Sequence, residues 1–370
     1  MTENKIDKVD LFFAALNPYT QSNTVDGTEK KISGKDFIGW GENNAYPSFL
    51  WDCYSDCTTL QSIINGTSDY VVGDDVICNI PEFSKAINKK GETIRDIVQK
   101  ISIDYLIYGS FALQVIRNMA GKVAEIYWLD ISKLRSDEKN EVFFYSDDWS
   151  KSFGRVKYIK YPKFGIDDTN PTSIFYFKGN KTRSVYGLPI WSAAIKNVMI
   201  DKNITDFHLN EINNNFMGSK IVSFNNGMPD DNMKNEIERN LNEKFSGAAN
   251  AGRILISFAQ NKDNAPNIID LGTDDFDKRY ETLEKRNTQQ IFVAFRSQPI
   301  LFGLQKENNG FSQDEYLQAF ALFNRTMVKP IQNDIIKSFD KILGNENSIS
   351  IKPFSIEVVD DTLTDKEVVQ

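Results

Sequence analysis

Apolar residues recur at helical spacing in several long stretches of the chain. One lies between Tyr46 and Tyr70 and another between Glu92 and Tyr108, where residues three or four apart share one face. Pro47 suits the first turn of the earlier helix, because a backbone N–H there has no helical partner. The same pattern predicts further helices over residues 188–216, 231–245, 274–296 and 312–344.

Strand-like patterns fill most of the middle of the chain. The segments FALQVIRN (111–118) and VAEIYWL (123–129) flank a short turn, which predicts a hairpin. In residues 155–161 charged and apolar residues alternate, as in a sheet with one face in solvent. Residues 1–45 are polar and broken by glycines, so we expect an irregular arm. Further strands are expected at 141–146, 172–178, 220–224, 253–258 and 349–359.

The order of these elements indicates an α+β fold with a stalk. A long helix, a small β insertion and a second long helix would form a stalk with a knob at its tip. A polar loop and another long helix then follow. Ser312 and Glu315 form a capping-box pattern at the start of that last helix. Pro330 lies inside it and should kink it, because proline removes one backbone hydrogen bond.

Composition and charge narrow the function classes. The 370 residues allow about two to three structural units. With 26 Phe, 14 Tyr and 5 Trp, most of the chain must be folded. The net charge of −8 argues against a protein that grips nucleic acid with a basic face. It leaves open a protein through which nucleic acid passes without being gripped.

Residues for cofactor or metal chemistry are scarce. His208 is the single histidine of the sequence, and no phosphate-binding loop or dinucleotide fingerprint is present, so no cofactor is expected. Cys53, Cys57 and Cys78 are too few for a disulfide framework and make a poor zinc site, so we expect reduced thiols in a cytosolic setting. The N-terminus is polar and charged, so we expect no signal peptide there, and no apolar run approaches a membrane span.

Two sets of residues are candidates for catalysis. Asp201, His208 and Glu211 would lie on roughly one face of a helix, where they could ligate a metal or relay a proton. No fourth ligand is evident, and a solvated helix face is the favoured interpretation. The acidic run Asp274, Asp275 and Asp277 could suggest a two-metal site. A helix N-terminus explains it better, since carboxylates there complement the helix dipole. An enzyme is the weaker class.

Four phrases of the sequence are more informative in their order than any short motif. They are YLIYGSFALQVIRNMAGKVAEIYWLDISKLR (105–135), SVYGLPIWSAAIKNV (184–198), NNFMGSKIVSFNNGMP (214–229) with GAANAGRILIS (247–257), and QQIFVAFRSQPILFGL (289–304). In this order the chain resembles, over about residues 46–345, the portal proteins of tailed bacteriophages. Those proteins form rings at the head-to-tail vertex through which DNA enters and leaves the capsid. Gly109, Gly187 and Pro299 within these phrases also fit ordinary turns and a helix end.

The resemblance implies a division of the chain into portal regions. Residues 1–187 would form an N-terminal arm and an α/β wing. The stem helices would be 188–216 and 273–296, with a small, hairpin-like α/β clip at 217–272 between them. Residues 297–344 would hold a tunnel loop (297–312) and the kinked helix, and 345–370 a short crown or tail.

Specific residues acquire expected roles from the same resemblance. Lys306, Asn308 and Asn309 in the tunnel loop are candidates to face DNA, with an ordinary polar loop as the alternative. A ring requires one surface to meet a different surface on the neighbour. Apolar side chains of the stem helices would be poorly buried in a monomer and are expected to pack between subunits; they are Ile204, Phe207, Phe276, Tyr280 and Leu283.

Partners and location also follow from the resemblance. We expect a dodecameric homo-oligomer in the virion, present in the host cytoplasm during assembly, with double-stranded DNA passing through its channel. Terminase, major capsid and scaffold proteins, and a head–tail adaptor are the implied protein partners, and no membrane is implied. Packaging energy would come from the terminase ATPase. The rival hypotheses are a hydrolase or nuclease using Asp201, His208 and Glu211, and another head–tail connector protein.

Overall fold

The computed structural model describes most of the chain and divides it into two compact units. The described residues are 10–12, 27–32, 34–150, 156–167, 169–179, 184–213, 220–224, 232–233, 236, 239, 254–258, 276–304 and 313–356. The smaller unit comprises Met1–Thr24 and Met199–Asn287, and the larger unit comprises Val25–Val198 and Thr288–Gln370.

Three helices of the larger unit pack through buried aliphatic and aromatic side chains. They are α1 (Tyr46–Asp56), α2 (Thr58–Val72) and α3 (Ile94–Tyr108). The single helix expected over residues 46–70 is two helices, because Cys57 adopts an extended conformation and its Sγ accepts the Leu60 N–H at the start of α2. For α3 the prediction is confirmed, and the reciprocal hydrogen bonds of Thr93 and Asp96 fix where it begins.

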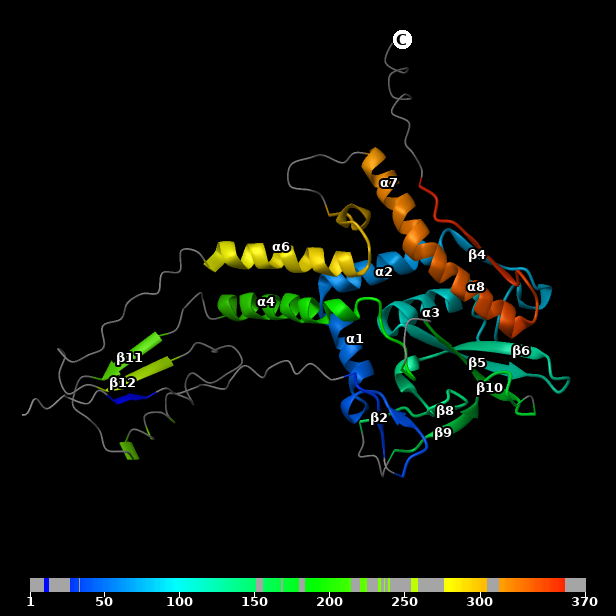
Figure 1. The fold of residues 1–370 in the computed structure, drawn as a ribbon, viewed down its shortest axis with the longest axis horizontal. Helices are drawn as coiled ribbons and strands as arrows, with labels where there is room; N and C mark the ends of the chain where they lie inside the picture. The colour runs from blue at the N-terminus through cyan, green and yellow to red at the C-terminus, as the bar shows by residue number, and fades with distance from the viewer. Residues whose placement is uncertain are drawn as a thin grey trace, which may run out of the picture. The chain divides into compact units, whose positions relative to one another are not determined.

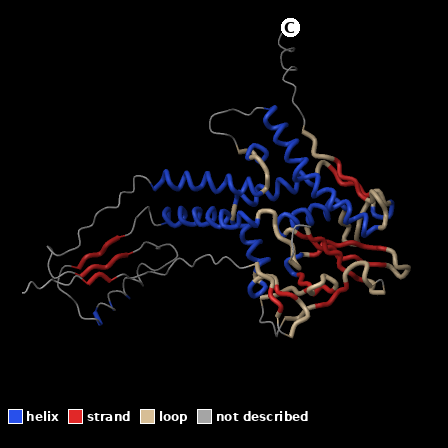
Figure 2. Tube along the Cα trace, viewed as in Figure 1, coloured by secondary structure: helices blue, strands red, loops and turns tan. Residues whose placement is uncertain are grey.

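Six strands of the larger unit form two neighbouring antiparallel sheets. The predicted hairpin is present as β5 (Ser110–Arg117) and β6 (Val123–Leu129), and β10 (Thr172–Lys178) pairs with the other edge of β5. A second sheet has the order β7-β8-β9 and holds Leu134–Ser136, Val142–Tyr145 and Ile159–Pro162. A bridge between Lys163 and Ile174 joins the two sheets. Figure 2 shows these strands together, with α3 packed on β5 and β6.

The C-terminal helical region of the larger unit packs against α2. The predicted helix over 312–344 is α7 (Gln313–Phe323) and α8 (Lys329–Leu343), joined by the π-helical segment η7 (Asn324–Val328). Pro330 lies just after this segment, so the expected irregularity takes the form of a widened turn. The Gln332 side chain donates to Val71 O at 2.9 Å and so satisfies the end of α2.

A short sheet joins the C-terminal segment to the body of the larger unit. β13 (Ile349–Lys352) pairs with β4 (Asp75–Cys78) in antiparallel register. β13 lies within the strand expected at 349–359 but ends at Lys352, whereas β4 was not predicted. The described part of the region expected as a crown or tail is packed on the larger unit.

Short elements complete the larger unit. The arm contributes β2 (Lys30–Lys31), β3 (Ile38–Gly39) and the 3₁₀ turn η1 (Glu42–Asn44), so part of it is more regular than expected. The remaining 3₁₀ turns are η2 (Pro81–Phe83), η3 (Ile131–Lys133), η4 (Ser192–Ala194) and η6 (Pro299–Phe302).

The smaller unit contains a three-stranded sheet of order β1-β12-β11. β11 (Lys220–Phe224) and β12 (Ile254–Phe258) are parallel, so the hairpin-like clip that we expected is wrong in topology. Parallel neighbours need a crossover connection rather than a tight turn. β1 (Asp10–Phe12) pairs antiparallel with β12, which puts these residues with the predicted clip instead of the predicted N-terminal arm and wing. Most of the helix expected over 231–245 lies outside the described residues.

The predicted stem helices correspond to α4 (Ile195–Asn213) and α6 (Phe276–Ala294) (Figure 1). The boundary between the two units falls within each helix, after Val198 in α4 and after Asn287 in α6. None of the helices in the described residues combines the length and the apolar composition that a membrane span requires.

Candidate channel and assembly site

The first two sequence phrases meet at a pair of glycines in the larger unit. Gly109 ends α3 in the left-handed conformation, with φ of 72°, and its N–H donates to Tyr105 O. A Cβ on Gly109 would lie 2.2 Å from Leu188 O, and one on Gly187 would lie 2.7 Å from the Gly109 carbonyl carbon. Only glycines allow the two backbones to approach this closely. The chain before α4 is thus held against the end of α3.

Side chains on either side of Gly187 reinforce this contact. The hydroxyl of Tyr186 donates to Ile38 O and accepts the Ser136 N–H, and its ring stacks on Trp40 with centroids 4.4 Å apart. Trp191 is fully buried, and its Nε1 donates to Leu106 O at 2.9 Å. These contacts fix the start of the predicted stem on the larger unit.

Glu29 ties the arm to the same segment. Its carboxylate oxygens accept the backbone N–H groups of Val185 and Tyr186 at 2.9 and 2.7 Å. Hydrogen bonds from two consecutive amides to one carboxylate are charge-assisted and directional. The arm therefore has a structural role at the stem start that the sequence did not indicate.

Arg135, the last residue of the first sequence phrase, is buried and holds the turn before α1. Its Nε and one terminal nitrogen donate to the side-chain and backbone oxygens of Asn44, both at 3.0 Å. The other terminal nitrogen donates to Ser132 O and Leu134 O. The guanidinium also lies 4.8 Å from the Trp149 ring centroid. Burial lowers the pKa of Arg135 to about 10, so the group stays charged at neutral pH.

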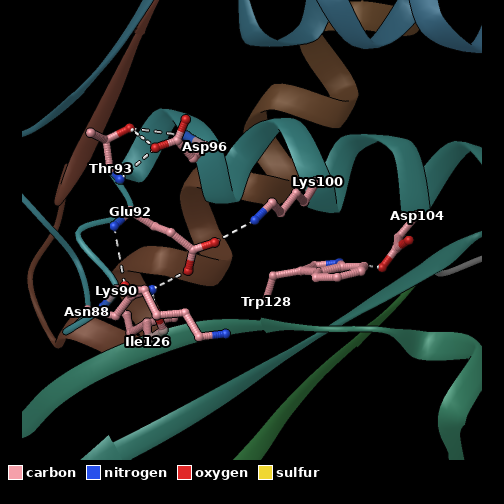
Figure 3. Close-up of polar contacts among 9 residues, drawn as sticks. All are labelled: Asn88, Lys90, Glu92, Thr93, Asp96, Lys100, Asp104, Ile126 and Trp128. Atoms are coloured by element: carbon pink, nitrogen blue, oxygen red, sulfur yellow. Dashed lines mark hydrogen bonds and ion pairs between the residues drawn. The ribbon is translucent and has the colours of Figure 1, made fainter. Parts of the chain in front are cut away.

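A polar network connects α3 with the neighbouring loop and β6 (Figure 3). Glu92 accepts from Asn88 and forms an ion pair with Lys100, whose ammonium lies 5.7 Å from the Trp128 ring centroid. Trp128 Nε1 in turn donates to Asp104 Oδ2 at 2.7 Å. Burial raises the pKa of Asp104 well above its usual value. The hydrogen bond from the Trp128 indole N–H satisfies the buried Asp104 carboxyl. The network therefore contributes to the packing of α3 on the sheet.

Tyr70 holds both ends of the segment that we expect to form the tunnel loop. Its hydroxyl donates to Leu301 O at 2.9 Å and lies 3.2 Å from the hydroxyl of Tyr316 in α7. Because Tyr70 has one proton to donate, it accepts from Tyr316. Burial raises the pKa of Tyr70, which keeps this proton in place. Four phenylalanine rings surround Tyr70 with centroids 5.0–6.3 Å away, and we call this set the Tyr70 cluster: Tyr70, Phe302, Phe320, Phe323 and Phe354.

The residues proposed for DNA contact, Lys306, Asn308 and Asn309, lie outside the described residues. The flanking segments are described: Leu304 follows η6 on one side, and Gln313 begins α7 on the other. Their contact with DNA stays a prediction.

The predicted inter-subunit residues of the stem helices have different environments. Ile204 is buried within the single chain, so the expectation that it is poorly buried outside a ring is wrong for this residue. Leu283 is 38% exposed. The side chains of Phe207, Phe276 and Tyr280 lie outside the described part of the structure. Packing of these residues between subunits stays a prediction.

The catalytic candidates are not assembled into a described site. His208 is exposed on α4 and Asp201 is half-buried, while the side chain of Glu211 is outside the described residues. Within the described residues, no group of three or more His, Cys, Asp or Glu could hold a metal ion. Asp274 and Asp275 and the side chain of Asp277 also lie outside the described part. The three cysteines are buried thiols rather than disulfides, as expected.

Comparisons with known proteins agree with this architecture. The family model of the phage portal protein matches residues 87–362. A chain from the neck of the native gene transfer agent (GTA) particle, computed with C12 symmetry, is 15% identical with a TM-score of 0.57, and the match covers 89% of this chain and 86% of that one. An HK97 family phage portal protein from Corynebacterium diphtheriae is 11% identical with a TM-score of 0.52, covering 82% and 93%. No curated protein matches the chain.

The fold is therefore that of a portal protein, with helices and sheets mixed as the sequence predicted. Since the family match extends over most of the chain, the protein belongs to the phage portal protein family. The resemblance seen in the sequence is confirmed.

Proposed function

We propose that this protein forms a ring-shaped channel at the vertex of a phage capsid, through which double-stranded DNA is packaged and later ejected. The observation that carries the proposal is the family match over residues 87–362, which includes both predicted stem helices and the described flanks of the tunnel segment. The structure of the neck that contains the similar chain was computed with C12 symmetry. A dodecamer in the virion is the corresponding assembly, formed in the host cytoplasm.

A conduit for DNA requires weak contacts that do not depend on sequence. Each phosphate neutralised by a fixed Lys or Arg adds to the affinity, and many such contacts would hold the DNA in place. The net charge of −8 suits a protein through which DNA passes better than one that holds DNA tightly. Lys306, Asn308 and Asn309 are the proposed channel-facing groups, and Phe207, Phe276, Tyr280 and Leu283 the proposed packing residues between stems.

The protein would act as a structural component without catalysis of its own. Terminase and a head–tail adaptor would dock on the ring, and capsid and scaffold proteins would surround it during assembly. The sequence contains no phosphate-binding loop of the kind that nucleotide-driven motors use, so a separate terminase ATPase would drive the DNA.

DNA packaging into heads assembled with and without this protein tests the proposal. Heads reconstituted from the capsid, scaffold and terminase proteins of the same phage should protect DNA from nuclease only when this chain is included. Lys306→Ala should still permit packaging but retain less of the packaged DNA, because one weak phosphate contact that holds the DNA is lost. Lys139→Ala, an exposed substitution outside the tunnel segment, is the matched control and should package normally. Equal packaging by heads that lack the protein would contradict the proposal.

A further inference from the structure

The C-terminal segment of the described chain reaches the cluster that holds the ends of the predicted tunnel segment. Figure 1 shows this segment, in red, running from β13 back along α8 towards α7. Phe354 packs edge-on against Tyr70 with ring centroids 5.0 Å apart and lies 6.3 Å from the Phe320 ring. Of the four phenylalanines around Tyr70, Phe354 is the nearest by centroid distance.

Hydrogen bonds hold the chain on both sides of Phe354. Before it, β13 pairs with β4, and Asp74 N–H donates to Lys352 O at 3.2 Å. After it, Ser355 donates its backbone N–H and its hydroxyl to the two carboxylate oxygens of Asp74. Hydrogen bonds at Lys352 and at Ser355 therefore hold the segment so that the Phe354 ring packs against Tyr70.

The turn after α2 is built to receive this segment. Gly73 has φ of 64°, and a Cβ there would lie 2.0 Å from Lys352 O, so a side chain is excluded where the C-terminal strand crosses. Arg95 donates to Asp74 O at 2.7 Å and thereby braces the same turn from α3. The contact is thus a specific fit between the end of α2 and residues 352–355.

Tyr70 contacts three segments of the chain that are far apart in sequence. It bonds Leu301 near the start of the predicted tunnel segment (297–312) and Tyr316 after its end, and it packs on Phe354 of the C-terminal segment. Phe302 lies in the same cluster, and Gly66 of α2 leaves room for its ring. Displacing Phe354 would therefore remove one of the aromatic contacts that hold the Tyr70 ring in the Tyr70 cluster.

We infer that residues 353–355 position the two ends of the predicted tunnel segment by holding Tyr70 against Leu301 and Tyr316. Phe354 is a positioning residue for this part of the chain, and whatever binds or moves the C-terminal region is coupled through Tyr70 to residues 299–304 and 313–320. The importance of this coupling for a DNA channel rests on the proposed function, but the coupling itself is a property of the isolated chain.

Hydrogen exchange of the full-length protein tests the inference. Phe354→Ala should raise amide exchange in residues 299–304 and 313–320 by up to about tenfold, the effect of removing one favourable aromatic pair. Ser355→Ala, which keeps the ring and weakens one of the two attachments, should produce a smaller increase in the same residues. Ser350→Ala is the matched control, because Ser350 is exposed on β13, and should change neither segment.

The pattern of exchange separates positioning from a general loss of stability. A merely destabilised protein would exchange faster throughout, including the β5–β6 hairpin, whereas positioning predicts no change in that hairpin. If Phe354→Ala or Ser355→Ala speeds exchange only in residues 349–352, the C-terminal segment docks without positioning Tyr70, and the inference is wrong. Uniformly faster exchange would also overturn it. Failure of the proposed function would instead appear in the packaging experiment and leave the exchange pattern unchanged.

Discussion

Gly109→Ala should lower the free energy of unfolding of the larger unit by more than about 3 kcal/mol, the range of severe core defects. Two costs combine. Alanine in the left-handed conformation costs about 1–2 kcal/mol. Its Cβ would also lie 2.2 Å from Leu188 O, a backbone atom held in place by the buried Trp191 that follows it. Chemical denaturation followed by circular dichroism measures the change.

Gly121→Ala is the control for the backbone term. Gly121 has φ of 78°, but nothing lies within 4 Å of the position that a Cβ would take, so only the conformational cost of about 1–2 kcal/mol applies. The difference between the two variants therefore isolates the close approach of the two chain segments. Equal losses for Gly109→Ala and Gly121→Ala would show that the contact with Leu188 is unimportant.

Arg135→Lys should destabilise the larger unit by about 2–4 kcal/mol although the charge is retained. Lysine presents its donors at one point and cannot reproduce the planar fork. The two oxygens of Asn44 and the carbonyls of Ser132 and Leu134 would then compete for one ammonium in a buried site. The contact of the guanidinium with Trp149 would also be lost.

The same denaturation experiment, read by tryptophan fluorescence, measures this loss. Trp40 and Trp149 flank Arg135, so their emission reports on the site directly. Lys139→Ala, an exposed change four residues away, should stay within about 0.5 kcal/mol of the unaltered protein. An Arg135→Lys protein as stable as the original would mean that charge alone, rather than the fork geometry, holds the turn.

Local signals account for the parts of the fold that were predicted correctly. The apolar spacing of residues 94–108 defines α3, and the turn between two strand-like runs defines the β5–β6 hairpin. Both depend on residues close together in sequence. The break at Cys57 was missed, because a thiol acting as a helix cap has no distinctive sequence pattern.

Contacts between distant residues account for most of what was missed. β4 was not predicted, and its pairing with β13 joins Val76 to Ile351, while β1 reaches β12 from the N-terminal arm. Tyr70 bonds residues more than 230 positions away, so no local pattern identifies its contacts at the predicted tunnel segment. Resemblance to a family is the basis for predicting the segment, while the contacts of Tyr70 required the structure.

The most direct test of the central claim is the mass and shape of the purified protein. Light scattering combined with electron microscopy should show closed rings with a central channel, at about twelve times the chain mass of 42.2 kDa if the twelvefold symmetry of the neck relative applies. A stable, compact dimer without a channel would contradict the account.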